Sequence, residues 1–139
     1  MDVEAFQLTA VGRVESPLRA LSEAPKQGDE GAPEAWLLFE PDVTPALQGI
    51  AVGERVLVIT WLDRGDREVL QVHPRDDRSR PLMGVFATRS PDRPNPIGLH
   101  AVDVLEIDGP RMRVSGLEAI DGTPVLDVKP VLRANVGER

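Results

Sequence analysis

The chain has 139 residues, of which 41% are apolar, and this length and composition predict one domain with a single hydrophobic core. It contains no cysteine, which excludes a disulfide framework, a cysteine-ligated metal and a cysteine nucleophile, and its two histidines are poor material for a zinc site. The formal net charge of −7 argues against a nonspecific nucleic-acid binder, whose affinity depends on many phosphate contacts.

The first half of the chain predicts strands separated by loops. "AFQLTAVGRV" (5–14) places Phe6, Leu8, Ala10, Gly12 and Val14 on one face at period two, as in a strand. "SEAPKQGDEGAPE" (22–34) predicts a long loop, and the short apolar strand "AWLLFE" ends at a proline. One helical turn is expected around "TPALQGI" (44–50). The continuous apolar run "RVLVITWL" (55–62) is typical of a strand buried on both faces.

The second half repeats this pattern. The turn "DRGDRE" leads into "VLQVH", and "LMGVFATR" leads to a proline-rich loop and the alternating strand "IGLHAVDVLEI". "IDGPRM" predicts a hairpin, because Asp-Gly supplies the positive φ of tight hairpin turns, and "DGTP" predicts a turn before "VLDVKPVL". About eight short strands at regular spacing predict a mainly all-β fold, a sandwich or a barrel, with long connecting loops and little helix. We expect a single domain over 1–139 with no C-terminal extension domain.

The loop "RSPDRPNPIG" (89–98) holds three prolines within six residues, flanked by two arginines. Proline fixes φ and lowers the entropy of the free loop, so polar groups on it can be placed before a ligand arrives. Arg89 and Arg93 are then suited to bind a carboxylate or phosphate at the mouth of the barrel. The alternative is that the prolines only end strands and that the arginines pair with Asp92 or Asp121.

No motif identifies a catalytic residue. The chain has no G-x-S-x-G and no glycine-rich phosphate loop. Asp121 and Asp127 are candidates for paired carboxylates, but turn capping is the ordinary role for Asp121. His73 and His100 are expected to lie on strand surfaces or to make one hydrogen bond each.

Three loops taken together carry a resemblance. The run "MGVFATRSPDRPNPIGLHAVDVLEIDG", the later "LEAIDGTPVLDVKP", the opening "VGRVESP" and the loop "APKQG" resemble the TsaA-like (YaeB/TrmO) family. The resemblance spans about Phe6 to Leu132. It implies a small β-barrel that works as a homodimer and transfers a methyl group from S-adenosylmethionine to N6 of threonylcarbamoyladenosine, next to the anticodon of tRNA.

The resemblance also implies site residues. Those implied for the cofactor are Pro25, Lys26, Gln27, Leu62, Asp63, Arg89, Leu99, Leu117, Glu118, Ala119 and Ile120. Those considered for the acceptor are Arg78, Arg80, Arg93, Asn95 and Asp121. Lys26 stands where the family usually has arginine, and Glu118 where aspartate is frequent.

Two other functions share this sequence pattern. One is a methyltransferase that acts on a small molecule or a protein, and the other is a barrel that binds S-adenosylmethionine as a non-enzymatic sensor. No apolar stretch approaches the roughly 20 residues of a membrane span, and the acidic N-terminus lacks the pattern of a signal peptide. We therefore expect a cytoplasmic protein without a membrane partner or a metal.

Overall fold

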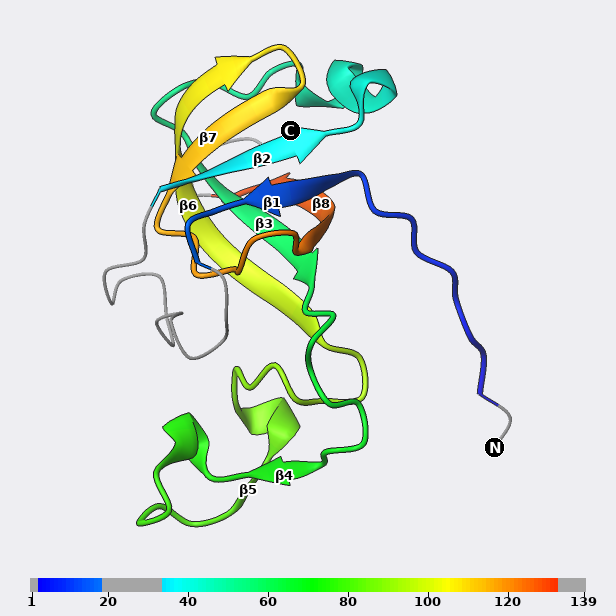
Figure 1. The fold of residues 1–139 in the computed structure, drawn as a ribbon, viewed down its shortest axis with the longest axis vertical. Helices are drawn as coiled ribbons and strands as arrows, with labels where there is room; N and C mark the ends of the chain where they lie inside the picture. Colours follow the sequence, from blue (N-terminus) through cyan, green and yellow to red (C-terminus); the bar gives the residue numbers. More distant parts are fainter. Residues whose placement is uncertain (1–2, 19–33, 133–139) are drawn as a thin grey trace.

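A computed structural model describes residues 3–18 and 34–132, and these form a closed antiparallel barrel with a smaller lobe beneath it (Figure 1). The strands close in the order β1-β2-β7-β6-β3-β8. Their bounds are Gly12–Glu15 (β1), Ala35–Phe39 (β2), Arg55–Trp61 (β3), Ile97–Asp108 (β6), Arg111–Ser115 (β7) and Pro124–Pro130 (β8). The mainly β fold is as predicted from the turn spacing, which left a sandwich or a barrel open, and the barrel is the architecture that the resemblance implied.

The barrel interior follows the period-two alternation of the strands. In β3 the inward positions are Val56, Val58 and Thr60, and in β6 they include Val102 and Val104. The buried core is otherwise built from valine, leucine, phenylalanine, alanine and Met112, which fill a barrel of this size without leaving a channel. Register shifts place an extra residue in β8, opposite Ile59/Thr60 of β3, and in β6, between Val104 and Glu106, and bulges of this kind bend the strand that carries them.

The two predicted Asp-Gly turns are confirmed. β6 and β7 form a hairpin around Gly109, whose φ is 57°, and Gly122 before β8 has a φ of 85°. The helical turn expected at 44–50 is present as a 3₁₀ helix that begins earlier, at Pro41–Leu47.

Two strand predictions were wrong in detail. The first strand covers only Gly12–Glu15, and Phe6 is 81% exposed, because the pairing with β2 ends at Gly12 opposite Phe39 and the pairing with β8 ends at Gly12 opposite Val125. In β3 the outward residues Leu57 and Ile59 are only half-buried, so this strand is covered on one face rather than on two.

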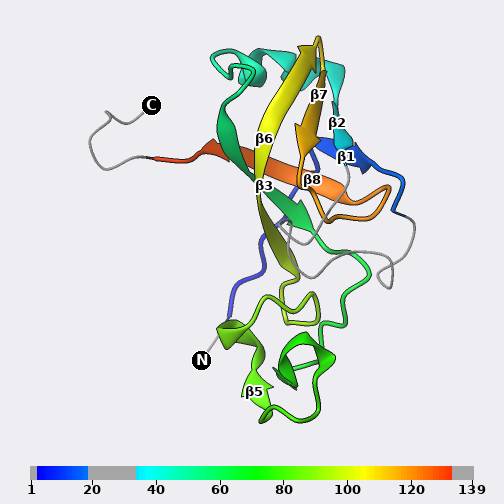
Figure 2. The ribbon, with the colours of Figure 1, turned by 90° about the vertical axis from the view of Figure 1, so that its left-hand side faces the viewer.

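The insertion lobe, which we define as residues 62–96, connects β3 to its barrel neighbour β6. It contains a two-residue ladder of β4 (Gln71–Val72) and β5 (Met83–Gly84), and 3₁₀ turns at Pro74–Asp76 and Val85–Ala87. Figure 2 shows the lobe extending below the barrel. No helix within the described residues has the length and apolar composition needed to cross a bilayer.

Candidate functional site

A groove of about 1430 Å³ lies between the barrel and the insertion lobe. Its walls come from the first half of β3, the lobe, the first half of β6 and the segment before β8. Within the described residues it is lined by six arginines and four carboxylates, so it is net positive in a chain whose net charge is −7. Although the chain as a whole is acidic, this groove is therefore locally suited to anionic groups.

The proline loop forms one wall of this groove and is held by its own polar groups. The backbone N–H of Ser90 donates to Thr88 Oγ1 at 3.1 Å, and that of Asp92 donates to Ser90 Oγ at 3.1 Å. Arg93 Nη1 donates to the carbonyl oxygens of Thr88 and Ser90, at 2.9 and 3.0 Å. This arginine, expected to bind substrate, therefore uses one guanidinium nitrogen to fix the loop on which it lies.

The neighbouring segment 63–68 fastens the same loop to the barrel. Arg67 Nε donates to Pro94 O at 2.6 Å, its Nη2 donates to Asn95 Oδ1 at 3.0 Å, and its guanidinium lies over the ring of Trp61, 5.3 Å from the centroid. Asp92 Oδ1 accepts from the N–H of Asp66 at 2.8 Å. A side chain at Gly65 would collide with the carbonyl oxygen of Pro91, so the two loops pack backbone to backbone.

Arg89 is placed at the junction of the loop and the groove. Its side chain is exposed, and Nη1 donates to the carbonyl oxygen of Leu99 at 3.2 Å. Within the described residues it pairs with neither Asp92 nor Asp121, so that alternative is not what the structure has. Among residues 3–18 and 34–132 the other guanidinium nitrogens of Arg89 have no hydrogen-bond partner, so they can donate to a ligand.

A buried polar cluster lies where the groove meets the barrel interior. His100 is 5% exposed, its Nε2 is 2.7 Å from Thr60 Oγ1, and its Nδ1 is 2.6 Å from Glu118 Oε1. The expectation that His100 lies on a strand surface was wrong, because it has the parity of Val102 and Val104 and so points inward.

Gly98, the last residue of the proline motif, makes room for this cluster. A Cβ there would collide with Thr60 Oγ1 and would lie 2.8 Å from His100 Nε2. Since real Cβ atoms do not approach that closely, the Thr60–His100 hydrogen bond requires glycine at this position.

Asp121 stabilises the backbone rather than lining the groove. Its Oδ1 accepts from the N–H of Ser16 at 3.0 Å, and its own N–H donates to Leu18 O at 2.7 Å. This side chain therefore fixes the chain as it leaves β1, a capping role of the kind expected for it.

The structure brings most of the expected site residues together. The groove is lined by Leu62, Asp63, Arg80, Arg89, Arg93, Asn95, Leu99, Glu118, Ala119 and Ile120. Leu117 is instead fully buried in the core, and Arg78 and Asp121 do not line the groove. Pro25, Lys26 and Gln27 lie outside the described residues.

Sequence reasoning missed Thr60 and His100 as parts of the site. A signal was present, because each is a polar residue among inward positions of its strand that otherwise carry valine or glycine. Within the described part of the chain, no group of three or more histidine, aspartate or glutamate side chains is placed to hold a metal ion.

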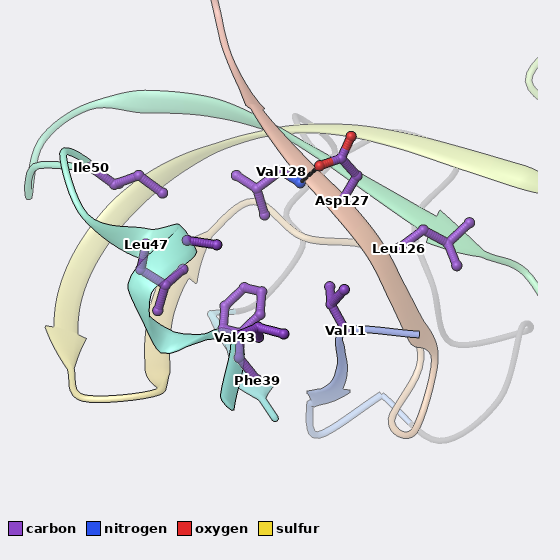
Figure 3. Close-up of a pocket in the computed structure, with 9 residues that line it drawn as sticks. Val11, Phe39, Val43, Leu47, Ile50, Leu126, Asp127 and Val128 are labelled. Atoms are coloured by element: carbon purple, nitrogen blue, oxygen red, sulfur yellow. Dashed lines mark hydrogen bonds between the residues drawn. The ribbon is translucent and has the colours of Figure 1, made fainter. Parts of the chain in front are cut away.

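A second, apolar pocket of about 150 Å³ lies on a different part of the barrel, beside the 3₁₀ helix Pro41–Leu47. Figure 3 shows Phe39, Val43 and Leu47 converging on it from one side and Val11 and Val128 from the other. Its one charged side chain, Asp127, accepts a hydrogen bond from the N–H of Val128 and pairs with Lys129 at 3.2 Å, which leaves little polar chemistry for a ligand.

Comparison with known proteins identifies relatives of this barrel. The family model described as the tRNA-methyltransferase O N-terminal domain matches residues 13–135. A probable S-adenosyl-L-methionine-binding protein of Archaeoglobus fulgidus is 45% identical over 125 residues, covering 89% of this chain and 33% of the relative. One of Methanothermobacter thermautotrophicus is 42% identical over 125 residues, covering 90% of this chain and 89% of the relative.

Solved structures agree with these matches. The crystal structure of TrmO from Pseudomonas aeruginosa superposes with a TM-score of 0.75 at 25% identity, covering 99% of this chain and 63% of that one. The chain thus spans about a third of the Archaeoglobus relative and less than two thirds of the Pseudomonas protein.

Proposed function

The chain belongs to the tRNA-methyltransferase O N-terminal domain family, and from this premise we propose that it is an S-adenosylmethionine-dependent methyltransferase that binds its cofactor in the groove. The observation that carries the proposal is the pre-arranged, net-positive groove that gathers the residues implied by the family motifs. The names of its relatives as S-adenosyl-L-methionine-binding proteins support it.

The groove's chemistry fits such a ligand. Leu62, Leu99 and Ile120 offer apolar contacts for an adenine, and Asp63 and Glu118 offer acceptors for hydroxyl or amino groups. Arg89 offers charged donors for a carboxylate. At about 1430 Å³ the groove exceeds the roughly 300–1000 Å³ of ordinary small-molecule sites, which leaves room for a methyl acceptor beside the cofactor.

The reaction requires mainly that the protein position the cofactor and the methyl acceptor relative to each other. The sulfonium of the bound cofactor supplies an electrophilic methyl group, and the protein holds the acceptor nitrogen in line with the S–CH3 bond. Holding two reactants in this geometry contributes up to about 7–11 kcal/mol of the barrier. The loop fastened by Arg67 and Arg93 gives this wall of the groove the rigidity that such placement needs. We assign no general base.

We further propose that the acceptor is N6 of threonylcarbamoyladenosine beside the anticodon of a tRNA, in the cytoplasm. Arg80 and Arg93 line the groove and are suited to contact phosphate, whereas Arg78 lies outside the groove lining. Since few phosphates are neutralised, the logarithm of affinity should fall with the logarithm of salt concentration at a shallow slope of about −2 to −3.

The test is transfer of labelled methyl from S-adenosylmethionine to an anticodon stem-loop carrying the threonylcarbamoyl group. The same stem-loop without the modification is the control and should accept no label. If cofactor-loaded protein labels neither the modified stem-loop nor bulk tRNA, the tRNA acceptor is wrong. A small-molecule methyltransferase or a non-enzymatic sensor then becomes the better function.

Cofactor binding is tested separately by calorimetry with Arg89→Ala. Loss of a charge-assisted hydrogen bond should weaken S-adenosylmethionine binding by about 1.5–3 kcal/mol. Arg78→Ala is the matched control, because Arg78 does not line the groove, and it should leave cofactor affinity unchanged. Equal losses in the two variants would mean that the cofactor lies elsewhere.

We also propose that the protein works as a homodimer. The lobe exposes Leu70, Leu82 and Phe86, the last at 82%, and the N-terminal segment exposes Phe6 and Leu8. Apolar side chains with this degree of exposure are candidates for a surface that a partner chain covers. Light scattering should give the mass of two chains at micromolar concentration, and the mass of one chain would contradict the proposal.

A further inference from the structure

His100, Thr60 and Glu118 form a hydrogen-bonded side-chain cluster at the edge of a core that is built mainly from apolar side chains. A buried polar side chain costs free energy unless its hydrogen bonds are made, and an apolar residue at His100 would fill the same volume without that requirement. Both ring nitrogens of His100 are in fact bonded, at 2.7 Å to Thr60 and 2.6 Å to Glu118. The ring is therefore held in one orientation.

The chemistry of the partners fixes where the proton lies. An ionised carboxylate only accepts hydrogen bonds, so Nδ1 of His100 carries a proton and donates it to Glu118 Oε1. The hydroxyl of Thr60 can donate to or accept from Nε2, and this side chain is fully buried on β3. Thr60 Oγ1 thus bonds the ring of His100 at Nε2, and the same ring bonds the Glu118 carboxylate at Nδ1.

Glu118 connects the cluster to the groove. Its side chain is 20% exposed and lines the groove wall, whereas the histidine beside it is buried. Only Oε1 has a hydrogen-bond partner within the described residues, so Oε2 is available as an acceptor. A carboxylate held in this way presents one oxygen to the protein and one to the groove.

We propose that His100, backed by Thr60, is a positioning residue: it aims the Glu118 carboxylate so that Oε2 accepts a hydrogen bond from a hydroxyl or amino group of the nucleoside bound in the groove. This rests on the proposed placement of S-adenosylmethionine there. Pre-orienting the acceptor removes the cost of ordering a glutamate side chain when the ligand binds. Gly98 serves the same end, since any side chain at that position would displace the ring.

Two variants of His100 separate positioning from mere packing. His100→Asn places an amide N–H near the position of Nδ1, so it keeps the donor to Glu118 and loses the contact to Thr60. His100→Gln places its amide near the position of Nε2, so it keeps Thr60 and loses Glu118. Each variant gives up one hydrogen bond of the pair, and urea unfolding should show similar losses of stability for both.

The readout is the affinity for S-adenosylhomocysteine, measured by calorimetry so that no turnover is needed. His100→Gln should weaken binding at least about tenfold, and His100→Asn by less than about threefold. Equal weakening, or wild-type affinity in His100→Gln, overturns the positioning role while leaving the cofactor site in place. Absence of binding by the wild-type protein would instead overturn the proposed site, and the positioning role with it.

A second measurement keeps the test decisive should His100→Gln fail to fold. His100 is one of only two histidines, so its ring nitrogens can be followed by NMR in the unaltered protein. The Nδ1 resonance should show a proton bound in the free protein and should shift when S-adenosylhomocysteine is added. An Nδ1 without a proton, or a resonance that does not respond to bound ligand, overturns the proposal.

Discussion

Different interactions stabilise the barrel and the insertion lobe. All fourteen residues of the buried core cluster lie outside residues 62–96, on the barrel strands and their connections. The lobe has two strands of two residues each, and its loops are held by side chains that bond backbone groups, such as Arg67 to Pro94 and Arg93 to Thr88.

Because of this difference, the barrel should determine the stability of the chain, and the lobe should determine the positions of side chains that line the groove. Hydrophobic burial supplies most of the folding free energy, so the barrel should set the global stability of the chain. Hydrogen bonds from side chains to backbone groups on an exposed segment contribute little net free energy, but they fix the positions of groups that line the groove. Substitutions in the two regions should therefore have different consequences.

The largest contrast is expected from a matched pair of valines. Val58 in β3 and Val85 in the lobe are both buried, at 0% and 2% exposure. Val58→Ala should lower the free energy of unfolding by about 2–3 kcal/mol, from two lost methyl groups at about 0.8 kcal/mol each and a cavity. Val85→Ala should cost less than about 1 kcal/mol, because the lobe can open without the barrel. Urea unfolding measures both, and equal costs would mean that lobe and barrel unfold as one unit.

A pair of glycines gives the next effect. Gly98→Ala forces a Cβ against Thr60 and His100, and overpacking of this kind costs about 1–3 kcal/mol. Gly84→Ala in the lobe meets no atom within 4 Å, so it should change stability by less than about 0.5 kcal/mol. Thermal unfolding distinguishes them; a silent Gly98→Ala would show that the buried cluster can shift without cost.

Arg67→Ala should loosen the lobe while leaving the barrel intact. It removes the hydrogen bonds to Pro94 and Asn95 and the contact with the Trp61 ring. Losing about 1.4 kcal/mol locally would speed hydrogen exchange at the amides of Leu62 and Ile97 about tenfold, with core amides unaffected. Arg78→Ala is the control, since no hydrogen bond or ion pair of Arg78 occurs among the described residues. Faster exchange throughout β2 would contradict the separation of the two regions.

The smallest effect concerns the exposed turn at Asp77. Hydrogen bonds from the Ser79 hydroxyl and backbone N–H hold the pKa of Asp77 below its ordinary value. A depressed pKa in the folded state stabilises the turn above the ordinary pKa of aspartate, and this contribution is lost as the pH falls through the lowered value. Ser79→Ala should raise the pKa of Asp77, as followed by NMR titration of the carboxyl group. The Leu37 amide in the barrel should not respond, and a response there would link the turn to the core.

Local patterns predicted strands and turns of the barrel, because turn residues and alternating side chains act over a few neighbouring residues; they left open whether the strands form a sandwich or a barrel. Asp108-Gly109 and Asp121-Gly122 specify turns through backbone conformation, and period-two alternation placed Val102 and Val104 on a common face. The same alternation misled at Phe6 and Leu8, because a strand also needs a neighbour to pair with, and the pairing of this segment with β2 and with β8 ends at Gly12.

The site was predictable as a set of loops but not as a set of contacts. The motifs indicated which segments meet at the groove, and Leu62, Arg89 and Glu118 are found there. That Arg93 binds carbonyl groups of its own loop, and that His100 connects β3 to Glu118, depends on distances between segments up to 40 residues apart. No spacing rule within a single sequence supplies those distances.

The ends of the insertion lobe lie side by side. Trp61 pairs with Ile97 in adjoining strands, and the N–H of Leu62 donates to Pro96 O at 2.7 Å. The 35 residues between them therefore connect the antiparallel strands β3 and β6 as a hairpin turn would. The entropy cost of closing such a connection grows only slowly with its length. The lobe can be exchanged, shortened or extended while β3 and β6 keep their register. Such a joint lets the surface of the lobe vary while the barrel, whose sequence is constrained by its core, keeps its fold.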